Sequence, residues 1–586
     1  MINLLKLIKE FKKKDFMLIF ISVLLILFQV WLDLKLPDYM TEITRLVQTE
    51  GTKISEVLTQ GGYMLLCAGG SLIAAFAVGY LVSYVSATFS KRTRKSLFEK
   101  VQSFSMEEMK KFRTSSLITR TTNDITNIQM FIAMGLQMLI KSPITAVWAI
   151  LKILGKGWEW SLVTFIAVIV LLVVIISLMV IVLPRFKIVQ KLIDNINGLT
   201  RENLNGIRVI RAFNAEKYQE DKFEEGNDVL TKTQTFNQKV MSIMSPCMYL
   251  IMNFLTLSIY TIGVSLINGA GMFDRLDIFS NMVVFSSYAM QVLMSFLMLA
   301  MIFIMYPRAS VSASRIREVL DTEAKIKDGN FKDDTKVYGE IEFKNVSFKY
   351  PDADEYILEN ISFKAKKGDT LAIIGSTGSG KSTIVNLIMR FYDVTDGEIL
   401  VDGVNIKDYN LESLHEKLGY VPQRAVMFDG SVNYNIGYGK NNVPEKQIKK
   451  AAKVAQATEF IENMPEKYEA NIAAGGTNIS GGQKQRVAIA RAIAKNPEIF
   501  VFDDSFSALD YKTDYVLRKE LKENIKEATS IIVAQRIGTI INADTIVVLD
   551  KGKTVGIGKH KDLLKKCKVY KEIALSQLSK EELENE

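Results

Sequence analysis

Histidine, cysteine and proline are scarce in this chain. Its 586 residues include two histidines, three cysteines and ten prolines. The cysteines are odd in number and far apart, at Cys67, Cys247 and Cys567, which argues against a disulfide framework or a zinc cluster. Because His415 and His560 are the only histidines, a mechanism that needs several histidines is excluded.

Apolar residues, by contrast, are abundant. They make up 48% of the chain, and the mean hydropathy is +0.13, which indicates that much of the chain is not water-soluble. Runs of about twenty apolar residues are long enough to cross roughly 30 Å of hydrocarbon. We predict six membrane spans, at 16–36, 63–85, 130–151, 161–183, 241–266 and 278–306.

The net charge of +9 is concentrated in particular segments. Lysine and arginine gather near the N-terminus and in the long connections that follow the second and fourth runs. By the positive-inside rule, both chain ends and these connections are cytoplasmic. The orientation of the chain in a lipid bilayer therefore accounts for its positive net charge. We predict no nucleic-acid partner. Segment 1–15 alternates apolar residues with lysines, as an amphipathic elbow helix on a membrane surface does.

The composition also predicts the domain boundaries. The transmembrane domain is expected over 16–320, with short helical tips near 114–120 and 213–219 in the two long cytoplasmic connections. A charged, glycine-containing linker at 321–338 follows. From 339 to 575 short strands alternate with helices, as in an α/β nucleotide-binding domain, and 576–586 is a charged tail.

The segment 371–383, LAIIGSTGSGKST, is the most informative motif. It joins a buried strand to a helix through the spacing G-x-x-x-x-G-K-[ST], in which backbone N–H groups and the helix N-terminus cradle a polyphosphate. Lys381 is expected to reach the β- and γ-phosphates, and the Ser382 hydroxyl to bind Mg²⁺. The expected ATP ligands here are Gly375, Ser376, Thr377, Gly378, Ser379, Gly380, Lys381, Ser382 and Thr383.

Three further residues fit the same cofactors, ATP and Mg²⁺. Tyr350 ends a predicted strand and is expected to stack on the adenine ring. Asp503 ends the buried strand IFVFD at 499–503, the Walker B arrangement that holds Mg²⁺ through water. Gln423, in YVPQ, supplies a neutral oxygen for the same metal.

A second anion-binding motif follows at 478–486, NISGGQKQR, just before a helix. One domain cannot readily wrap one ATP with both motifs, whereas two domains facing head to tail can. Each ATP is then held between the cradle of one chain and this motif of the other. The residues expected at that opposite site are Ser480, Gly481, Gly482, Gln483 and Asp510.

With these motifs, the whole chain resembles a half-transporter of the ATP-binding cassette (ABC) exporter family. The six spans followed by one cassette and the stretch ENLNGIRVIRAFNAE at 202–216 also resemble that family. The resemblance implies a multi-domain membrane protein: an all-α six-helix transmembrane domain of the type I/type IV exporter fold, then an α/β P-loop domain. It also implies a dimer, coupling helices that dock into grooves on the cassettes, and multi-pass insertion in a bacterial cell (inner) membrane.

Two positions depart from the family pattern. Asp504 stands where the family has a glutamate general base, and Gln535 where it has a switch histidine. Aspartate is one methylene shorter than glutamate, so its carboxylate lies about 1.5 Å further from the reaction and hydrolysis is slower. Glutamine cannot take up a proton as histidine does. We therefore expect intact ATP binding with slow hydrolysis, which resembles the degenerate-site subunit of heterodimeric bacterial multidrug exporters. The expected partner is a second half-transporter with the glutamate and histidine restored.

Alternative interpretations remain open. One is a slow homodimeric lipid or drug exporter, and another is an ATP-sensing regulatory membrane subunit. A nucleic-acid ATPase of the DNA-repair type shares the cassette motifs but does not explain six spans.

The cargo is expected to be a small hydrophobic or cationic compound. Asp33, late in the first span, could attract a cation, or it could instead be paired with Lys35 near the membrane surface. We interpret Lys141 as an interfacial or helix-paired lysine. In the last span one helical face carries polar side chains, as a helix lining a polar cavity does. The candidate cavity residues are Asp33, Asn281, Tyr288 and Gln291.

Overall fold

The structure, a computed structural model, describes residues 7–49, 51–154, 156–271, 274–332, 335, 337–439 and 443–578. They fall into two compact units: unit 1 is Met1–Gln102 with Thr114–Thr322, and unit 2 is Ser103–Arg113 with Glu323–Glu586. The predicted elbow helix begins outside the described residues, whose first element is a short 3-10 helix, η1 (Leu7–Glu10). Most of the predicted tail also lies outside them.

Unit 1 is entirely helical and confirms the six predicted spans. Six helical segments of the described chain are long and apolar enough to cross a membrane. The elements are α2 (Lys13–Gln48), α3 (Ile54–Gln102), α5 (Thr114–Thr119), the π-turn η2 (Arg120–Asp124), α6 (Ile125–Ile153), α7 (Trp158–Ala212), α8 (Glu216–Ser242), α9 (Met244–Gly269) and α10 (Asp274–Leu320).

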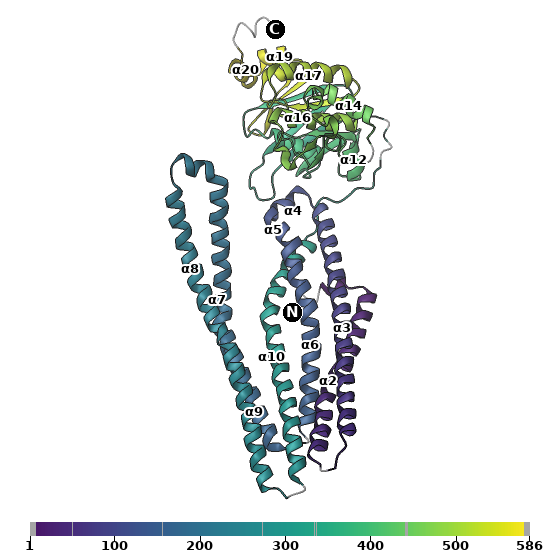
Figure 1. The fold of residues 1–586 in the computed structure, drawn as a ribbon. Coiled ribbons are helices and arrows are strands. Elements are labelled where there is room, and N and C mark those ends of the chain that lie inside the picture. The colour runs from purple at the N-terminus through teal and green to yellow at the C-terminus, as the bar shows by residue number, and fades with distance from the viewer. Residues whose placement is uncertain are drawn as a thin grey trace. The chain divides into compact units, whose positions relative to one another are not determined.

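These helices are longer than a bilayer requires. At 1.5 Å per residue, the 55 residues of α7 span about 80 Å, so the polar part of α7 extends beyond the membrane. It runs beside α8 as a long antiparallel pair (Figure 1). The predicted short helix at 213–219 is not found. A turn with Asn214 in the left-handed region (φ 48°) joins the two long helices directly, because asparagine tolerates that conformation.

The packing of unit 1 leaves a strongly apolar outer surface. The buried side chains include Trp160, Phe285 and Tyr288, whereas Leu65, Ile73 and Phe76 are each more than 70% exposed. So much exposed apolar surface is unfavourable in water but suits contact with lipid chains.

Unit 2 is an α/β domain around three sheets. A six-stranded sheet has the order β12-β11-β3-β10-β9-β6, a four-stranded antiparallel sheet has the order β2-β1-β4-β5, and β7 pairs with β8. The strands are β1 (Ile341–Phe348), β2 (Leu358–Ala365), β3 (Thr370–Gly375), β4 (Asp396–Val401), β5 (Val404–Asn405), β6 (Leu418–Val421), β7 (Gly430–Ser431), β8 (Asn471–Ile472), β9 (Ile499–Asp503), β10 (Thr529–Val533), β11 (Thr545–Asp550) and β12 (Lys553–Gly558).

Helices pack around these sheets and complete the domain. They are α4 (Met106–Lys111), α11 (Lys381–Ile388), α12 (Leu411–Lys417), α13 (Val432–Ile436), α14 (Glu445–Val454), α15 (Thr458–Glu462), η3 (Lys467–Glu469), η4 (Ala474–Gly476), α16 (Gly481–Lys495), α17 (Tyr511–Asn524), α18 (Ile537–Ile540), α19 (His560–Lys566) and α20 (Lys568–Leu575).

The order of the large sheet positions the site. Strands β3, β10, β9 and β6 are parallel neighbours, so their carboxyl ends lie along one edge. Both β9 and β10 are buried at every residue, which explains the apolar runs IFVF at 499–502 and IIV at 531–533. Ligands of open α/β sheets bind beyond the carboxyl ends of the strands, and the loops after these four strands carry the predicted motifs.

Unit 2 also contains a buried ion pair that sequence patterns do not reveal. Lys417 Nζ lies 2.8 Å from Asp402 Oδ2 and 3.1 Å from Glu498 Oε1, and the Asp402 side chain has no solvent exposure. Replacement of Lys417 by methionine leaves Asp402 as an uncompensated buried charge. We expect Lys417→Met to lower the free energy of unfolding of unit 2 by about 3–5 kcal/mol.

Thermal unfolding of the purified full chain measures the effect. The matched control is Lys344→Met, which removes an exposed ion pair with Glu398 and should cost at most about 1 kcal/mol. Equal shifts for the two variants would contradict the importance given to the buried pair.

Candidate functional site

The loop between β3 and α11 forms an open phosphate cradle. Gly378 and Gly380 have φ angles of +84° and +97°, which side-chain-bearing residues rarely adopt. A Cβ atom at Gly375 would lie 2.2 Å from the carbonyl oxygen of Leu549, so only glycine fits there. In front of Gly378 nothing lies within 4 Å of a Cβ position, which leaves its backbone accessible to a ligand.

The groups around this loop fit a polyphosphate. Lys381 Nζ donates to the carbonyl oxygens of Gly375 and Ser376, each at 2.8 Å. Burial lowers the pKa of Lys381, while the nearby Asp504 and Asp503 act in the opposite direction. The Ser379 hydroxyl is buried and, among the described residues, has no hydrogen-bond partner. A phosphate would supply the anionic oxygens that this loop lacks.

A magnesium site fits beside the cradle. Ser382 Oγ, in the first turn of α11, donates to Asp503 Oδ1 at 3.2 Å. Asp503 is only 7% exposed, and burial raises the pKa of its carboxyl group. Hydroxyl, carboxylate and amide oxygens are suitable ligands for Mg²⁺. Ser382, Asp503 and Gln423 would hold the ion, whose charge would neutralise phosphate oxygens.

Asp504 is held by two amide groups. Its Oδ2 accepts hydrogen bonds from Gln423 Nε2 at 3.2 Å and from Gln535 Nε2 at 2.9 Å. Asp504 is 8% exposed, and burial raises the pKa of its carboxyl group against the opposing effect of the Gln423 hydrogen bond. The structure thus joins residues that follow β9, β6 and β10.

The loop that carries Gln535 is fixed by a residue near the end of the described chain. Gln577 Nε2 donates to the Gln535 carbonyl oxygen at 2.7 Å, and Gln577 Oε1 accepts from the Ile537 N–H at 2.8 Å. Sequence reasoning missed Gln577, because an isolated glutamine beyond the last helix belongs to no motif.

The second anion-binding motif forms the N-terminus of α16. Ser480 caps this helix: its Oγ accepts from the Gln483 N–H at 3.3 Å, and Gln483 Oε1 accepts from the Ser480 N–H at 2.9 Å. Gly481 and Gly482 complete its first turn. Among the described residues, no hydrogen bond joins this motif to the cradle. Its predicted role toward the ATP of a second chain remains a proposal.

Asp510 lies next to that motif and also caps a helix. Its Oδ1 accepts from the Thr513 N–H at 2.9 Å at the start of α17, and this hydrogen bond lowers the pKa of the Asp510 carboxyl group. A Cβ atom at Gly482 would lie 3.5 Å from the Ala508 carbonyl oxygen, so the two loops are close. Asp510 therefore has a local structural role, whatever it contacts in an assembly.

Tyr350 has a partner that the sequence did not indicate. The segment 103–113 belongs to unit 2, and Lys110 Nζ in α4 lies 4.3 Å from the centre of the Tyr350 ring and 5.4 Å from that of Tyr392. The Tyr350 hydroxyl lies 3.3 Å from Thr383 Oγ1, which connects the ring to the end of the cradle. The predicted helical tip at 114–120 corresponds to α5 and the first residue of η2, which belong to unit 1 and not to unit 2.

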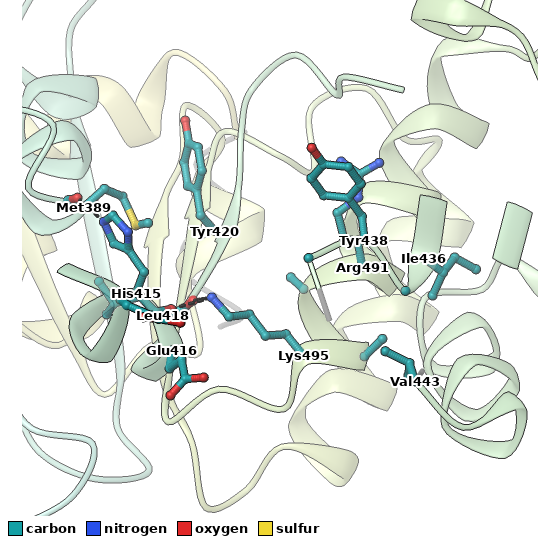
Figure 2. Close-up of a pocket in the computed structure, with 15 residues that line it drawn as sticks. Met389, His415, Glu416, Leu418, Tyr420, Ile436, Tyr438, Val443, Arg491 and Lys495 are labelled. Carbon is teal, nitrogen blue, oxygen red and sulfur yellow. Dashed lines mark hydrogen bonds between the residues drawn. The ribbon is translucent and has the colours of Figure 1, made fainter. Parts of the chain in front are cut away.

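A separate groove crosses unit 2 between α12 and the helical part of the domain. Its volume is about 450 Å³, and both polar and aromatic side chains line it. In Figure 2, Tyr438 lies against Arg491, and Lys495 extends toward the backbone beside Leu418, to which it donates a hydrogen bond of 2.9 Å. Tyr438 is 45% exposed, so an apolar surface is accessible at this groove.

The polar residues predicted to line a substrate cavity are mostly paired. Asp33 Oδ2 lies 3.1 Å from Lys141 Nζ, so its charge is already compensated and it is not a free attractant for cations. In the part of the chain that the structure describes, Lys35 contacts Asp38 and no ion pair joins it to Asp33. Tyr288 is fully buried and donates to Asp38 Oδ1 at 2.6 Å, which corrects its assignment to a cavity wall.

The other two candidates differ: one lies on a cavity wall, and the other has a buried side-chain oxygen. Asn281 Oδ1 accepts from Lys156 Nζ at 3.0 Å and lies on the wall of a cavity. Gln291 Oε1 is buried and has no hydrogen-bond partner among the described residues.

The position of Lys110 leads to a testable prediction. Its ammonium group covers the ring on which the adenine is expected to stack, so removal of this group should free that ring for the base. We expect Lys110→Ala to tighten ATP binding by the lone chain about two- to fivefold, the size of an exposed cation–π contact. Fluorescent-nucleotide titration measures this, with Lys111→Ala as the neighbouring control. Unchanged or weaker binding would contradict competition between the two groups.

Comparisons with known proteins agree with this geometry. The family model described as "ABC transporter transmembrane region" matches residues 16–296, and that described as "ABC transporter" matches residues 358–507. The chain is 37% identical to an uncharacterised ABC transporter ATP-binding protein of Mycobacterium bovis, over 92% of this chain and 93% of that protein. It is 30% identical to an ATP-dependent lipid A-core flippase of Pseudomonas aeruginosa, over 86% and 82%.

A solved structure shares the same architecture. It is described as a bacterial Atm1-family ABC exporter with ATP bound, and it aligns with a TM-score of 0.82 at 25% identity, over 95% of this chain and 98% of that one. Together with the cradle, the Walker B strand and the six apolar helices, these similarities show that the chain belongs to the ABC transporter family, as an exporter that couples ATP to transport.

Proposed function

We propose that this chain is one half of a heterodimeric ABC exporter, in which its own site binds ATP but hydrolyses it slowly. The observation that carries the proposal is the position of Asp504, held by the amides of Gln423 and Gln535. Its second half would be a half-transporter with a glutamate and a histidine at these two positions.

The chemistry at Asp504 supports slow hydrolysis. A general base must reach the attacking water with a free oxygen, and the shorter aspartate side chain already lies about 1.5 Å further back than a glutamate. Its Oδ2 also accepts two amide hydrogen bonds. Gln535 can donate a hydrogen bond but cannot gain or lose a proton, so no group here replaces the missing histidine.

The intact motifs support a contribution to the partner. Ser480 and the two glycines after it form the N-terminus of the 15-residue helix α16, and Ser480 is exposed to solvent. The Ser480 hydroxyl can still donate a hydrogen bond. This motif would complete the competent ATP site on the second chain. The composite site would then carry most of the hydrolysis.

The groove beside Tyr438 and Arg491 would transmit the change between ATP-bound and ATP-free states from the nucleotide-binding domain to the transmembrane helices. Its aromatic and cationic lining suits a short helical tip of a partner's transmembrane domain, as the family resemblance implies. In this arrangement both chain ends and the nucleotide-binding domain lie in the cytoplasm of a bacterial cell, with the spans in its inner membrane.

The proposed activity is multidrug-type efflux of hydrophobic compounds. The cationic cargo predicted from Asp33 loses its support, since Lys141 already compensates that carboxylate. A slow homodimeric lipid exporter is the second candidate, favoured by the 30% identity to a lipid A-core flippase. An ATP-sensing regulatory subunit would bind ATP without vectorial transport by the assembled complex.

Activity of the two-chain complex tests the asymmetry. With the partner present, we expect Ser480→Ala in this chain to reduce ATPase activity at least tenfold, because it damages the competent site. Asp504→Asn in this chain should reduce it far less. Strong ATPase activity from this chain alone, abolished by Asp504→Asn, would refute the asymmetric assignment.

Restoration of the missing groups provides a converse test. We expect Asp504→Glu combined with Gln535→His to raise the ATPase rate of the lone chain on the order of a hundredfold, because the carboxylate regains reach and the histidine regains a proton site. Steady-state phosphate release measures the rate. The same double variant with Lys381→Ala is the matched control and should be inactive; if the double variant gains nothing, slow hydrolysis has another cause.

A further inference from the structure

Helices α2, α6 and α10 of unit 1 pack against one another, and a line of partly exposed charged and polar side chains runs along their contact. We call this line the polar seam. It extends from the middle of α6 to the connection between α6 and α7, and its charged members come only from the first and third spans and their ends. The seam consists of Asp33, Lys35, Asp38, Lys141, Lys152, Lys156, Asn281 and Tyr288.

Both carboxylates of the seam are fully engaged. Asp33 uses one oxygen for Lys141, at 3.1 Å, and the other for the hydroxyl of Ser71. Asp38 accepts from Lys152 Nζ at 2.7 Å with one oxygen and from Tyr288 Oη at 2.6 Å with the other. Each of the four carboxylate oxygens therefore already has at least one donor, and the charge of each aspartate is compensated by a lysine.

The ammonium groups, by contrast, are in excess. Four lysines face two aspartates, so the seam carries two uncompensated positive charges. Lys35 makes only a long contact of 3.9 Å to Asp38 Oδ2, which Lys152 already occupies. Lys156 Nζ donates to the neutral amide oxygen of Asn281, at 3.0 Å, and among the described residues it makes no ion pair.

The excess charge adjoins a cavity of about 410 Å³, a size suited to a small ligand. Lys156 and Asn281 lie on its wall with Trp160, whose indole N–H is buried and, among the described residues, has no hydrogen-bond partner. Leu266 and Ile278 are among the apolar lining residues. Glu159 also lines the cavity, so the seam and the cavity together carry one net positive charge.

An uncompensated ammonium group at the edge of the hydrocarbon is costly, and such groups mark ligand pathways. We infer that Lys156 and its cavity bind the anionic headgroup of an amphiphile, such as a phosphate monoester or a carboxylate. The ammonium of Lys156 and the indole N–H of Trp160 are the donors, and the apolar lining accepts the start of the chain. As a statement about cargo, the inference rests on the proposed export function.

The test uses the full chain in phosphatidylcholine nanodiscs without ATP. The probes are radiolabelled dodecyl phosphate and dodecyltrimethylammonium, which differ in the sign of the headgroup charge. We expect Lys156→Gln to weaken dodecyl phosphate binding about tenfold, whereas Lys156→Arg retains it. Glu159→Gln should tighten dodecyl phosphate binding. Lys156→Gln should not weaken dodecyltrimethylammonium binding, and Glu159→Gln should not tighten it.

The inference would be overturned if both probes bound with equal affinity. It would also be overturned if Lys156→Gln kept its thermal unfolding temperature and bound dodecyl phosphate as tightly as the unchanged chain. ATP-driven movement of dodecyl phosphate by the two-chain complex identifies the anion as cargo. Binding without movement, in a complex that hydrolyses ATP, identifies it as a resident lipid headgroup, which also supports the site. A complex without ATPase activity refutes the export proposal and leaves the ATP-free binding result intact.

Discussion

The parallel alignment of β3, β10, β9 and β6 is the constraint on which the nucleotide site depends. Because these strands run in the same direction side by side, the residues that follow them must meet at one edge of the sheet. Ser382 of the cradle after β3 thereby bonds to Asp503 at the end of β9. Gln423 after β6 and Gln535 after β10 both bond to the next residue, Asp504. Apart from Asp503, the last residue of β9, the strands contribute mainly buried apolar side chains.

This edge also explains why the two unusual residues occur together. A carboxylate that is 8% exposed needs donors, and a glutamine side chain near it needs an acceptor. Asp504 and Gln535 satisfy each other at 2.9 Å, with Gln577 holding the loop of Gln535 in place. The pair is therefore structurally self-consistent: each side chain supplies the hydrogen-bond partner that the other needs, and the amide donors occupy one oxygen of Asp504.

Motifs made of consecutive residues were predictable, because their geometry is local. The cradle, the Walker B strand, the helix that begins in the SGGQ motif and the six apolar helices follow from spacing and from runs of one residue type. Contacts between distant segments were not predictable. Lys110 over Tyr350 and Lys417 with Glu498 join residues far apart in the chain, and only the folded arrangement brings them together.

Helix geometry explains why the role of Asp33 could not be derived from its own sequence neighbours. Lys35 is two residues away, and residues two apart on a helix point to different sides, so they do not pair readily. The partner, Lys141, comes from another helix, whose facing side is set by packing. Lys35 instead makes a long contact of 3.9 Å to Asp38, three residues further along the same helix.

Selectivity in such an interior depends on the charges that remain after pairing. Asp33 is the conspicuous carboxylate of the spans in the sequence, yet it is neutralised within the helix bundle, as is Asp38. The lysines that appear unremarkable in a basic chain supply the uncompensated charge. Asp504 lies in unit 2 and Lys156 in unit 1, so the proposed slow hydrolysis and the proposed binding of an anion depend on separate groups. A change at one of these positions should therefore leave the other property measurable.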